Sequence, residues 1–206
     1  ALLMVQVLLF HAWTVGSPIG VDAFILISAY LMTSSFVRRS ESGRMPFFIE
    51  RWANTFKRLI PPLAVAVAAT LAAGLWFLPR TRWRELVTQA FASMTYWENV
   101  RLAEVAADYF ADDHALASPF QHLWSMSMQG QMFILWPLVM TVAVLAARKL
   151  DVSIRKTVFV AFSAIAAASL IWLLFQDGSD GAIYFDTRAR IWEFAFGSAI
   201  AAAAPW

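Results

Sequence analysis

The sequence predicts an all-α protein, a polytopic bundle of transmembrane helices. Of its 206 residues, 60% are hydrophobic and only 15% are charged. The mean hydropathy of +0.60 is well above the level of soluble domains. Several apolar stretches also approach or reach the length of about 20 residues that a spanning helix needs. Because lipid offers backbone groups no water, such segments must satisfy their own hydrogen bonds as helices.

The apolar stretches divide into complete and incomplete spans. Four complete spans are predicted, at residues 20–37, 60–78, 128–147 and 157–175. Residues 1–15 and 194–206 predict two more spans that are cut short. We therefore expect about six spans in a single transmembrane domain, residues 1–206, truncated at both ends. A signal peptide is the alternative for residues 1–15, but no basic segment or cleavage site precedes the next apolar run.

Basic residues predict the orientation of the spans, because lysine and arginine gather in cytoplasmic loops. Two clusters mark two such loops: Arg38, Arg39, Arg44, Arg51, Lys57 and Arg58, and then Arg148, Lys149, Arg155 and Lys156. The spans at 20–37 and 128–147 then run inward, and those at 60–78 and 157–175 run outward.

Residues 84–103 do not fit this pattern as a full crossing. The segment mixes apolar residues with Glu85, Gln89, Glu98 and Arg101. We therefore expect one amphipathic helix that lies in the outer interface or re-enters the membrane. We predict three interfacial anchors for this segment: Trp83, Tyr96 and Trp97.

Composition excludes several classes of function. The formal net charge is only +2 and the basic residues are dispersed, which argues against a nucleic-acid-binding surface. The chain has no cysteine, which excludes disulfides, thiolate catalysis and cysteine metal sites. No metal site of any kind is predicted.

Polar residues within apolar helices are candidates for function, because placing them in lipid is costly. His11 lies in such a helix. It is either hydrogen-bonded to a neighbouring helix or a proton acceptor, since imidazole titrates near neutral pH. Asp22 stands at the outer end of the 20–37 span, where a carboxylate either caps the helix N-terminus or serves a site.

A cationic block precedes the 60–78 span. It contains Arg51, Lys57 and Arg58, and it is followed by Pro61 and Pro62, which the first turn of a helix tolerates. One interpretation is a positive-inside signal or an anchor for lipid headgroups. The other is a cytoplasmic clamp for an anionic ligand such as the phosphates of an acyl-CoA, which suits arginine's forked donors.

A second polar block surrounds the outer mouth of the 128–147 span. It contains His122, Trp124, Ser125 and Gln131. Trp124 is either an interfacial belt residue or part of a site. Gln131 lies too deep in the helix to lack a hydrogen-bond partner.

A third block begins the last apolar stretch and contains Arg190, Trp192 and Glu193. Arg190 and Glu193 are three residues apart, so a helix places them on one face. They form either a local ion pair or an arrangement in which Glu193 binds an acceptor.

Taken in order, five blocks resemble the acyltransferase-3 family of membrane O-acyltransferases, which acylate lipopolysaccharide O-antigen, peptidoglycan, macrolides and other glycans. Phe10-His11 is similar to the family's helix-1 histidine, and residues 20–33 are similar to its GVDxFFxxSGFL block. Residues 57–61 are similar to the basic stretch that ends in RIxP. Residues 122–137 are similar to HxWSLSVEEQFYLLWP, and residues 184–197 to YFxTxxRxWExxxG.

Three departures from the family pattern bear on the site. The position of the family's helix-1 arginine falls immediately before Ala1. Thr55 stands where the family usually has an arginine, with Arg51 or Lys57 as the substitute. Gln129-Gly130 replaces the usual paired glutamates, so no catalytic carboxylate is inferred there. The Gln-Gly form favours an actinobacterial member and hence a mycolate or other envelope glycolipid acceptor.

The resemblance implies a multi-pass enzyme of a bacterial inner membrane with no permanently bound cofactor. Acyl-CoA, most simply acetyl-CoA, would be the co-substrate and would bind from the cytoplasm at Arg58, Arg51 and Lys57. His11 would be the general base or a transient acyl carrier, and an envelope carbohydrate or glycolipid would be the acceptor. Acceptor binding or structural support is expected of Asp22, His122, Trp124, Ser125, Gln131, Arg190, Trp192 and Glu193.

Two other functions fit the same residues. In a transporter or flippase of a lipid-linked sugar, His11, Asp22 and Gln131 would line a path. The 20–37 span has no internal glycine or proline break and no inverted repeat is visible, which argues mildly against this function. In a structural membrane subunit, the polar residues would only join helices to one another.

Overall fold

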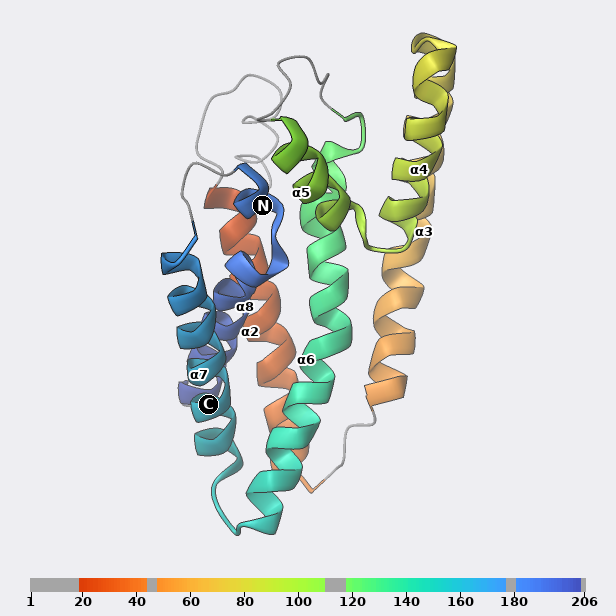
Figure 1. Ribbon diagram of the computed structural model, residues 1–206. Coiled ribbons are helices and arrows are strands. Elements are labelled where there is room, and N and C mark those ends of the chain that lie inside the picture. Colours follow the sequence, from red (N-terminus) through yellow and green to blue (C-terminus); the bar gives the residue numbers. More distant parts are fainter. Residues whose placement is uncertain (1–18, 44–47, 110–117, 177–180, 205–206) are drawn as a thin grey trace. The chain divides into compact units, whose positions relative to one another are not determined.

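The computed structural model describes residues 19–43, 48–109, 118–176 and 181–204, and the regular elements in these ranges are all helices (Figure 1). The long helices are α2 (Ile19–Glu41), α3 (Phe48–Phe77), α4 (Trp83–Met94), α5 (Glu98–Tyr109), α6 (Trp124–Lys149), α7 (Ile154–Leu174) and α8 (Thr187–Ala203). Short 3₁₀ turns lie between them: η1 (Arg80–Arg82), η2 (Gln121–Leu123) and η3 (Gly181–Phe185).

Four described helices are long and apolar enough to cross a membrane: Val21–Glu41, Phe48–Phe77, Gln121–Lys149 and Ile154–Leu174. They confirm the four complete spans predicted. Large apolar side chains are exposed on them, for example Val65 at 70% and Val160 at 64%, as expected for surfaces that face lipid. The predicted span at 1–15 lies outside the described residues. The stretch 194–206 falls largely in α8, which is not among the four.

The chain forms two compact units, which we describe separately. The described residues of unit 1 lie within Ala1–Pro46, Leu138–Ile171 and Arg190–Trp206. Figure 1 shows its helices α2, α7 and α8 side by side. Buried hydroxyl groups join them, because Thr33 donates to Ser198 at 2.9 Å and the backbone N–H of Trp192 donates to Ser169 at 3.2 Å. Such bonds hold helices together where lipid competes equally for apolar surface.

One end of unit 1 gathers its basic residues. Arg155, at the start of α7, donates to Glu41 at 2.7 Å and to the carbonyl of Ala204 at 2.7 Å. Arg148, near the end of α6, donates to the carbonyl of Ser40 at 3.2 Å. The C-terminal ends of α2, α6 and α8 therefore meet the start of α7. This end holds Arg38 and Arg39 of the first predicted basic cluster and Arg148 and Arg155 of the second, in agreement with the orientation inferred for these helices.

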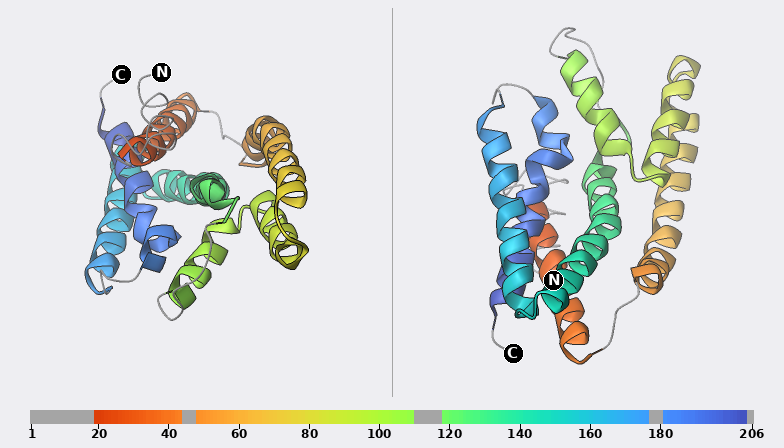
Figure 2. Two further views of the ribbon diagram at one scale, coloured as in Figure 1. Left: turned by 90° about the horizontal axis from the view of Figure 1, so that it is seen from above. Right: turned by 60° about the horizontal axis from the view of Figure 1, so that its bottom comes forward.

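Unit 2 contains the described residues within Phe47–Pro137 and Trp172–Ala189. Figure 2 shows α4 folded back along the end of α3. Leu63 and Val67 of α3 and Leu86 and Ala90 of α4 are buried in one apolar cluster. Gly74 allows this approach, because a Cβ at that position would lie 2.6 Å from a methyl group of Leu86.

Two expectations about helix boundaries are wrong. Residues 84–103 form two helices, because Tyr96 adopts a left-handed backbone (φ 57°) that ends α4 and redirects the chain into α5. The cationic block is not a loop, because α3 begins at Phe48 and contains all three cations. Pro61 and Pro62 are therefore interior to α3, where they remove two backbone donors from its hydrogen-bond ladder.

Helices α2 and α8 of unit 1 pack backbone against backbone at Gly197. A Cβ there would overlap the carbonyl oxygen of Leu26, and the Leu26 carbonyl carbon would lie only 3.1 Å away. A backbone atom cannot rotate aside as a side chain can. The glycine that ends the family block at 184–197 thus sets how closely the two helices approach.

We expect Gly197→Ala to destabilise the protein by about 1–3 kcal/mol, the usual cost of overpacking. Thermal unfolding of the full-length protein in detergent measures this. Gly74→Ala is the matched control and should cost less, since the Leu86 side chain can change rotamer. Equal melting temperatures for Gly197→Ala and the wild type would contradict this packing.

Candidate functional site

Three side chains of unit 2 form a closed hydrogen-bonded ring. Gln131 of α6 donates from Nε2 to Asn99 Oδ1 and to the Tyr96 carbonyl, each at 2.8 Å. Its Oε1 accepts a hydrogen bond from Thr187 Oγ1 at 2.8 Å. Asn99 Nδ2 donates to Thr187 Oγ1 at 2.8 Å and to the Phe185 carbonyl at 3.1 Å. We call Gln131, Asn99 and Thr187 the amide ring.

The amide ring meets the expectation that Gln131 needs partners. Both N–H groups of Gln131 and its oxygen are used, and the amide of Asn99 is used in the same way. Asn99 is fully buried. Removing any one member would leave the others as buried polar groups without partners. The ring also joins two of the predicted blocks, the one containing Gln131 and the one containing Thr187.

The turn at Tyr96 explains Gly130. The Tyr96 ring lies directly over Gly130, and a Cβ at that position would overlap the ring. Any larger residue would displace the tyrosine and with it the carbonyl that accepts from Gln131. Tyr96 is only 7% exposed, so its expected role as an interfacial anchor is wrong. Trp97, at 56% exposure, remains available for such a role.

Aromatic rings pack beside the amide ring. Trp124, at the start of α6, lies 4.8 Å from Tyr184 and 5.9 Å from Phe185, measured between ring centroids. Because Trp124 is buried, it packs inside the protein and does not act as an interfacial belt residue. Ser125 beside it is half-buried, and His122 in η2 is exposed.

A cavity of about 530 Å³ adjoins the amide ring within unit 2. Gln131 and Thr187 contribute to its wall. Its aromatic lining comes from Trp97, Trp172 and Phe185, and its other polar lining comes from Glu104, Gln176, Asp186 and Arg188. The volume is typical of small-molecule sites, which are about 300–1,000 Å³.

Unit 1 holds the other predicted polar residues. Nη1 of Arg190 lies 2.6 Å from Asp22 and 2.8 Å from Glu193. The Arg190–Glu193 pair is thus local to α8, as one interpretation expected, and Asp22 adds a second carboxylate from the first turn of α2. Trp192 of α8 is half-buried. Arg190 therefore pairs with two carboxylates, one from α2 and one from α8, and so links the two helices.

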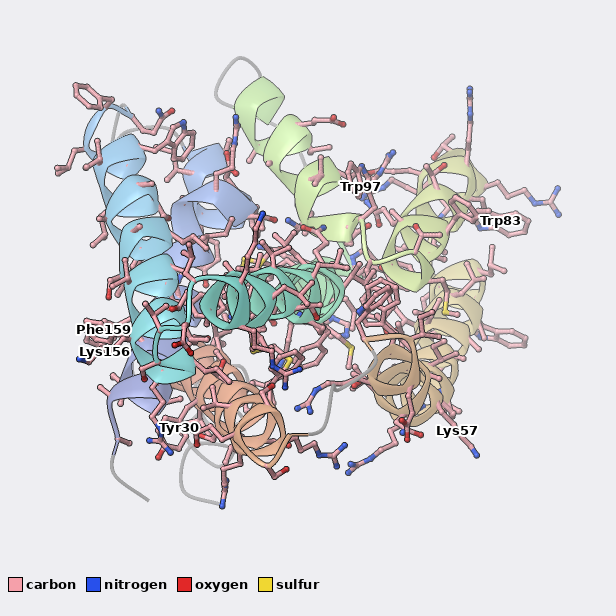
Figure 3. All side chains as sticks on the ribbon, turned by 90° about the horizontal axis from the view of Figure 1, so that it is seen from below. Tyr30, Lys57, Trp83, Trp97, Lys156 and Phe159 are labelled. Atoms are coloured by element: carbon pink, nitrogen blue, oxygen red, sulfur yellow. The ribbon has the colours of Figure 1, made fainter. Side chains whose placement is uncertain are left out.

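The cations of α3 are ordered along one helix. Arg51 and Arg58 are seven residues apart, and Thr55 lies between them on the same face. Arg51 is half-buried, whereas Lys57 and Arg58 are exposed. Figure 3 shows Lys57 projecting outward from α3. Arg51 therefore supplies a cation one turn before Thr55, the position at which the family usually has an arginine.

Glu98 was not singled out as a site residue from the sequence. It is fully buried at the start of α5, and neither carboxylate oxygen has a hydrogen-bond partner among the described residues. Burial raises the pKa of Glu98 to about 8, opposed by Arg101 and assisted by Glu85. The adjacent polar pair Glu98-Asn99 within an amphipathic segment is the only signal in the sequence that marked this position.

His11 lies outside the described residues, so its surroundings stay a prediction. Among the described residues, no group of three or more histidine and acidic side chains is placed to hold a metal ion.

Comparison with known proteins decides the family. The model of the acyltransferase-3 family, described as an acyltransferase domain, matches residues 1–206. The chain belongs to this family. O-acetyltransferase OatA of Staphylococcus aureus is 30% identical over 98% of the chain. The chain matches no solved structure.

Two further relatives of this acyltransferase-3 domain carry similar names. Peptidoglycan O-acetyltransferase OatA of Listeria monocytogenes is 27% identical, and putative peptidoglycan O-acetyltransferase YrhL of Bacillus subtilis is 25% identical, each over 98% of the chain. The chain spans about a third of each relative's length: 33% of the staphylococcal protein and 32% of the other two.

The amide ring predicts that Gln131→Ala destabilises the protein by about 1–3 kcal/mol, because Asn99 and Thr187 lose partners. Gln131→Glu should also destabilise it, since an ionised carboxylate cannot donate to the Tyr96 carbonyl. Thermal unfolding measures both variants. Gln121→Ala, at an exposed position in η2, is the control and should unfold like the wild type. Normal stability of both Gln131 variants would contradict the ring.

The buried Glu98 predicts a pH-dependent stability. The folded protein holds the Glu98 proton up to about pH 8, whereas an unperturbed glutamate releases it near 4.5. Stability from this group is therefore greatest below pH 4.5 and declines as the pH rises to 8. Glu98→Gln should flatten the melting temperature across this range.

Each 1 kcal/mol of this decline lowers the melting temperature by about 2–4 °C in a protein of this size. Glu50→Gln, at an exposed position of α3, is the matched control and should keep the wild-type pH profile. Parallel pH profiles for Glu98→Gln and the wild type would contradict a buried, protonated Glu98.

Proposed function

We propose that this chain is part of a membrane O-acyltransferase of a bacterial plasma membrane. The enzyme transfers an acyl group, most simply acetyl, from cytoplasmic acyl-CoA to a hydroxyl of a cell-envelope glycan or glycolipid. The family match along residues 1–206 carries the proposal. The names of the relatives, which include peptidoglycan O-acetyltransferase, support a glycan acceptor.

The donor is proposed to bind at the start of α3. Arg51 and Arg58 share a helix face there, and arginine pairs well with phosphate groups. Lys57 is exposed beside them. In unit 1, the described helix ends that carry basic residues lie together. The positive-inside rule places this end of the unit in the cytoplasm. By the same rule the start of α3 lies on the cytoplasmic side, where acyl-CoA is available.

The transfer step converts the thioester of acyl-CoA into an oxygen ester of the acceptor. The acceptor hydroxyl oxygen forms a bond to the acyl carbonyl carbon, the thioester C–S bond breaks, and the CoA sulfur leaves with a proton. His11 either removes the hydroxyl proton or carries the acyl group between two such exchanges. In the second case, the acyl group passes from sulfur to imidazole nitrogen and then to the acceptor oxygen.

The acceptor is proposed to approach the amide ring from the outer side. Gln131 lies near the start of α6 and Thr187 at the start of α8, and both line the 530 Å³ cavity. The predicted span at 128–147 runs inward, so the start of α6 is on the outer side. Support of this outer region is the role proposed for His122, Trp124 and Ser125. Within unit 1, Asp22, Arg190 and Glu193 would hold α2 and α8 together.

We expect His11→Ala to reduce acyl transfer by about 100-fold or more, the usual loss when a general acid–base group is removed. The full-length protein in membrane vesicles receives labelled acetyl-CoA on the cytoplasmic face, and label in envelope glycolipid and glycan is counted. Lys156→Ala, at an exposed position of α7, is the control and should keep wild-type transfer.

Two further readouts separate the alternatives. Mass spectrometry of protein quenched without acceptor should show an acetylated His11 if the residue is a carrier and none if it is a base. Full transfer by a His11→Ala protein that inserts normally would exclude both roles. Absence of transfer by the wild type with acetyl-CoA and longer acyl-CoA donors would contradict the acyltransferase itself and favour a transporter.

A further inference from the structure

The cavity beside the amide ring combines exposed aromatic surface with groups that form hydrogen bonds. Trp97, at the start of α5, contributes to its wall and is 56% exposed. Glu104 of α5 and Gln176, just after α7, supply a carboxylate and an amide to the same wall. Glu104 is exposed, and Gln176 makes only a long hydrogen bond, 3.4 Å, to the Trp172 carbonyl.

Trp172 is less available than Trp97. The guanidinium carbon of Arg188 lies 4.7 Å from the centre of the Trp172 ring, so the cation covers one face of that ring. Arg188 is also paired with Asp186 at 2.8 Å. Together, Arg188 and Asp186 form one edge of the cavity, and Trp97 is its open aromatic surface.

The residues that line this cavity favour some classes of ligand over others. An acyl chain would cover Glu104 and Gln176 without offering them hydrogen bonds, which is costly. The phosphates of an acyl-CoA would face the carboxylates of Glu104 and Asp186. Arg188 is the one cation among the described lining residues, and it is already paired. A neutral sugar presents an apolar C–H face to stack on an aromatic ring and hydroxyl groups around its edge to bond to amides and carboxylates.

We propose that this cavity is the acceptor's sugar subsite, in which a pyranose ring stacks on Trp97 and its hydroxyls bond to Glu104 and Gln176. The proposal rests on the proposed function, because it places the glycan acceptor. Gln131 and Thr187 of the amide ring line the cavity. The ring holds Trp97 indirectly, since Tyr96 and Asn99 on either side of it are bound to Gln131. Figure 3 shows Trp97 at the start of α5.

Binding is tested without any acyl donor, on the full-length protein in nanodiscs. Saturation-transfer NMR with chitotriose and with maltotriose reports contact with the sugar rings, and titration gives the dissociation constant. Trp97→Ala should weaken binding by about three- to tenfold or more, and Trp97→Phe, which keeps an aromatic face, should weaken it less. Trp76→Ala removes an exposed tryptophan outside the cavity and is the matched control.

A second readout uses transfer. Trp97→Ala should raise the KM for the glycan acceptor and leave the KM for acyl-CoA unchanged, with a melting temperature near that of the wild type. Unchanged sugar binding and acceptor KM in Trp97→Ala, or no binding of either oligosaccharide by the wild type, would overturn the subsite. Sugar binding that depends on Trp97, in a protein that shows no acyl transfer, would support the sugar subsite and contradict the proposed acyltransferase function.

Discussion

The primary amide of Gln131 must find its hydrogen-bond partners inside the protein, because it lies in a helix long and apolar enough to cross a membrane. It takes them from the Tyr96 carbonyl, Asn99 and Thr187, which belong to segments far apart in the sequence. The turn after α4, the start of α5 and the start of α8 are thereby fixed around one point of α6. The cavity exists where it does because these segments meet there.

Much of this arrangement follows from the sequence. Hydropathy and length predicted the four spans, since lipid leaves a chain few alternatives to a helix. The cost of an unpaired amide predicted that Gln131 needs partners. The spacing of Arg190 and Glu193 predicted that they share a helix face, and the ion pair between them was one of two interpretations. These predictions depend on local composition or on one helix alone, which a single sequence contains.

The features that were missed depend on contacts between segments. A left-handed tyrosine has no local sequence signal, so the break at Tyr96 between α4 and α5 was not predicted. Asn99 was not singled out, because only the fold brings it to Gln131. The early start of α3 was missed because Pro61 and Pro62 suggested a first turn, whereas the helix tolerates them in its interior.

The Tyr96 ring occupies the space that a side chain at position 130 would need, which limits the residues that relatives can combine at these two positions. The family pattern has paired glutamates where this chain has Gln129-Gly130, and a glutamate at position 130 does not fit under a tyrosine at 96. A lineage that moves between the two forms has to change both positions, and either change alone passes through a less stable protein. Residues 96 and 130 should therefore covary across relatives, with a bulky ring at one accompanying glycine at the other.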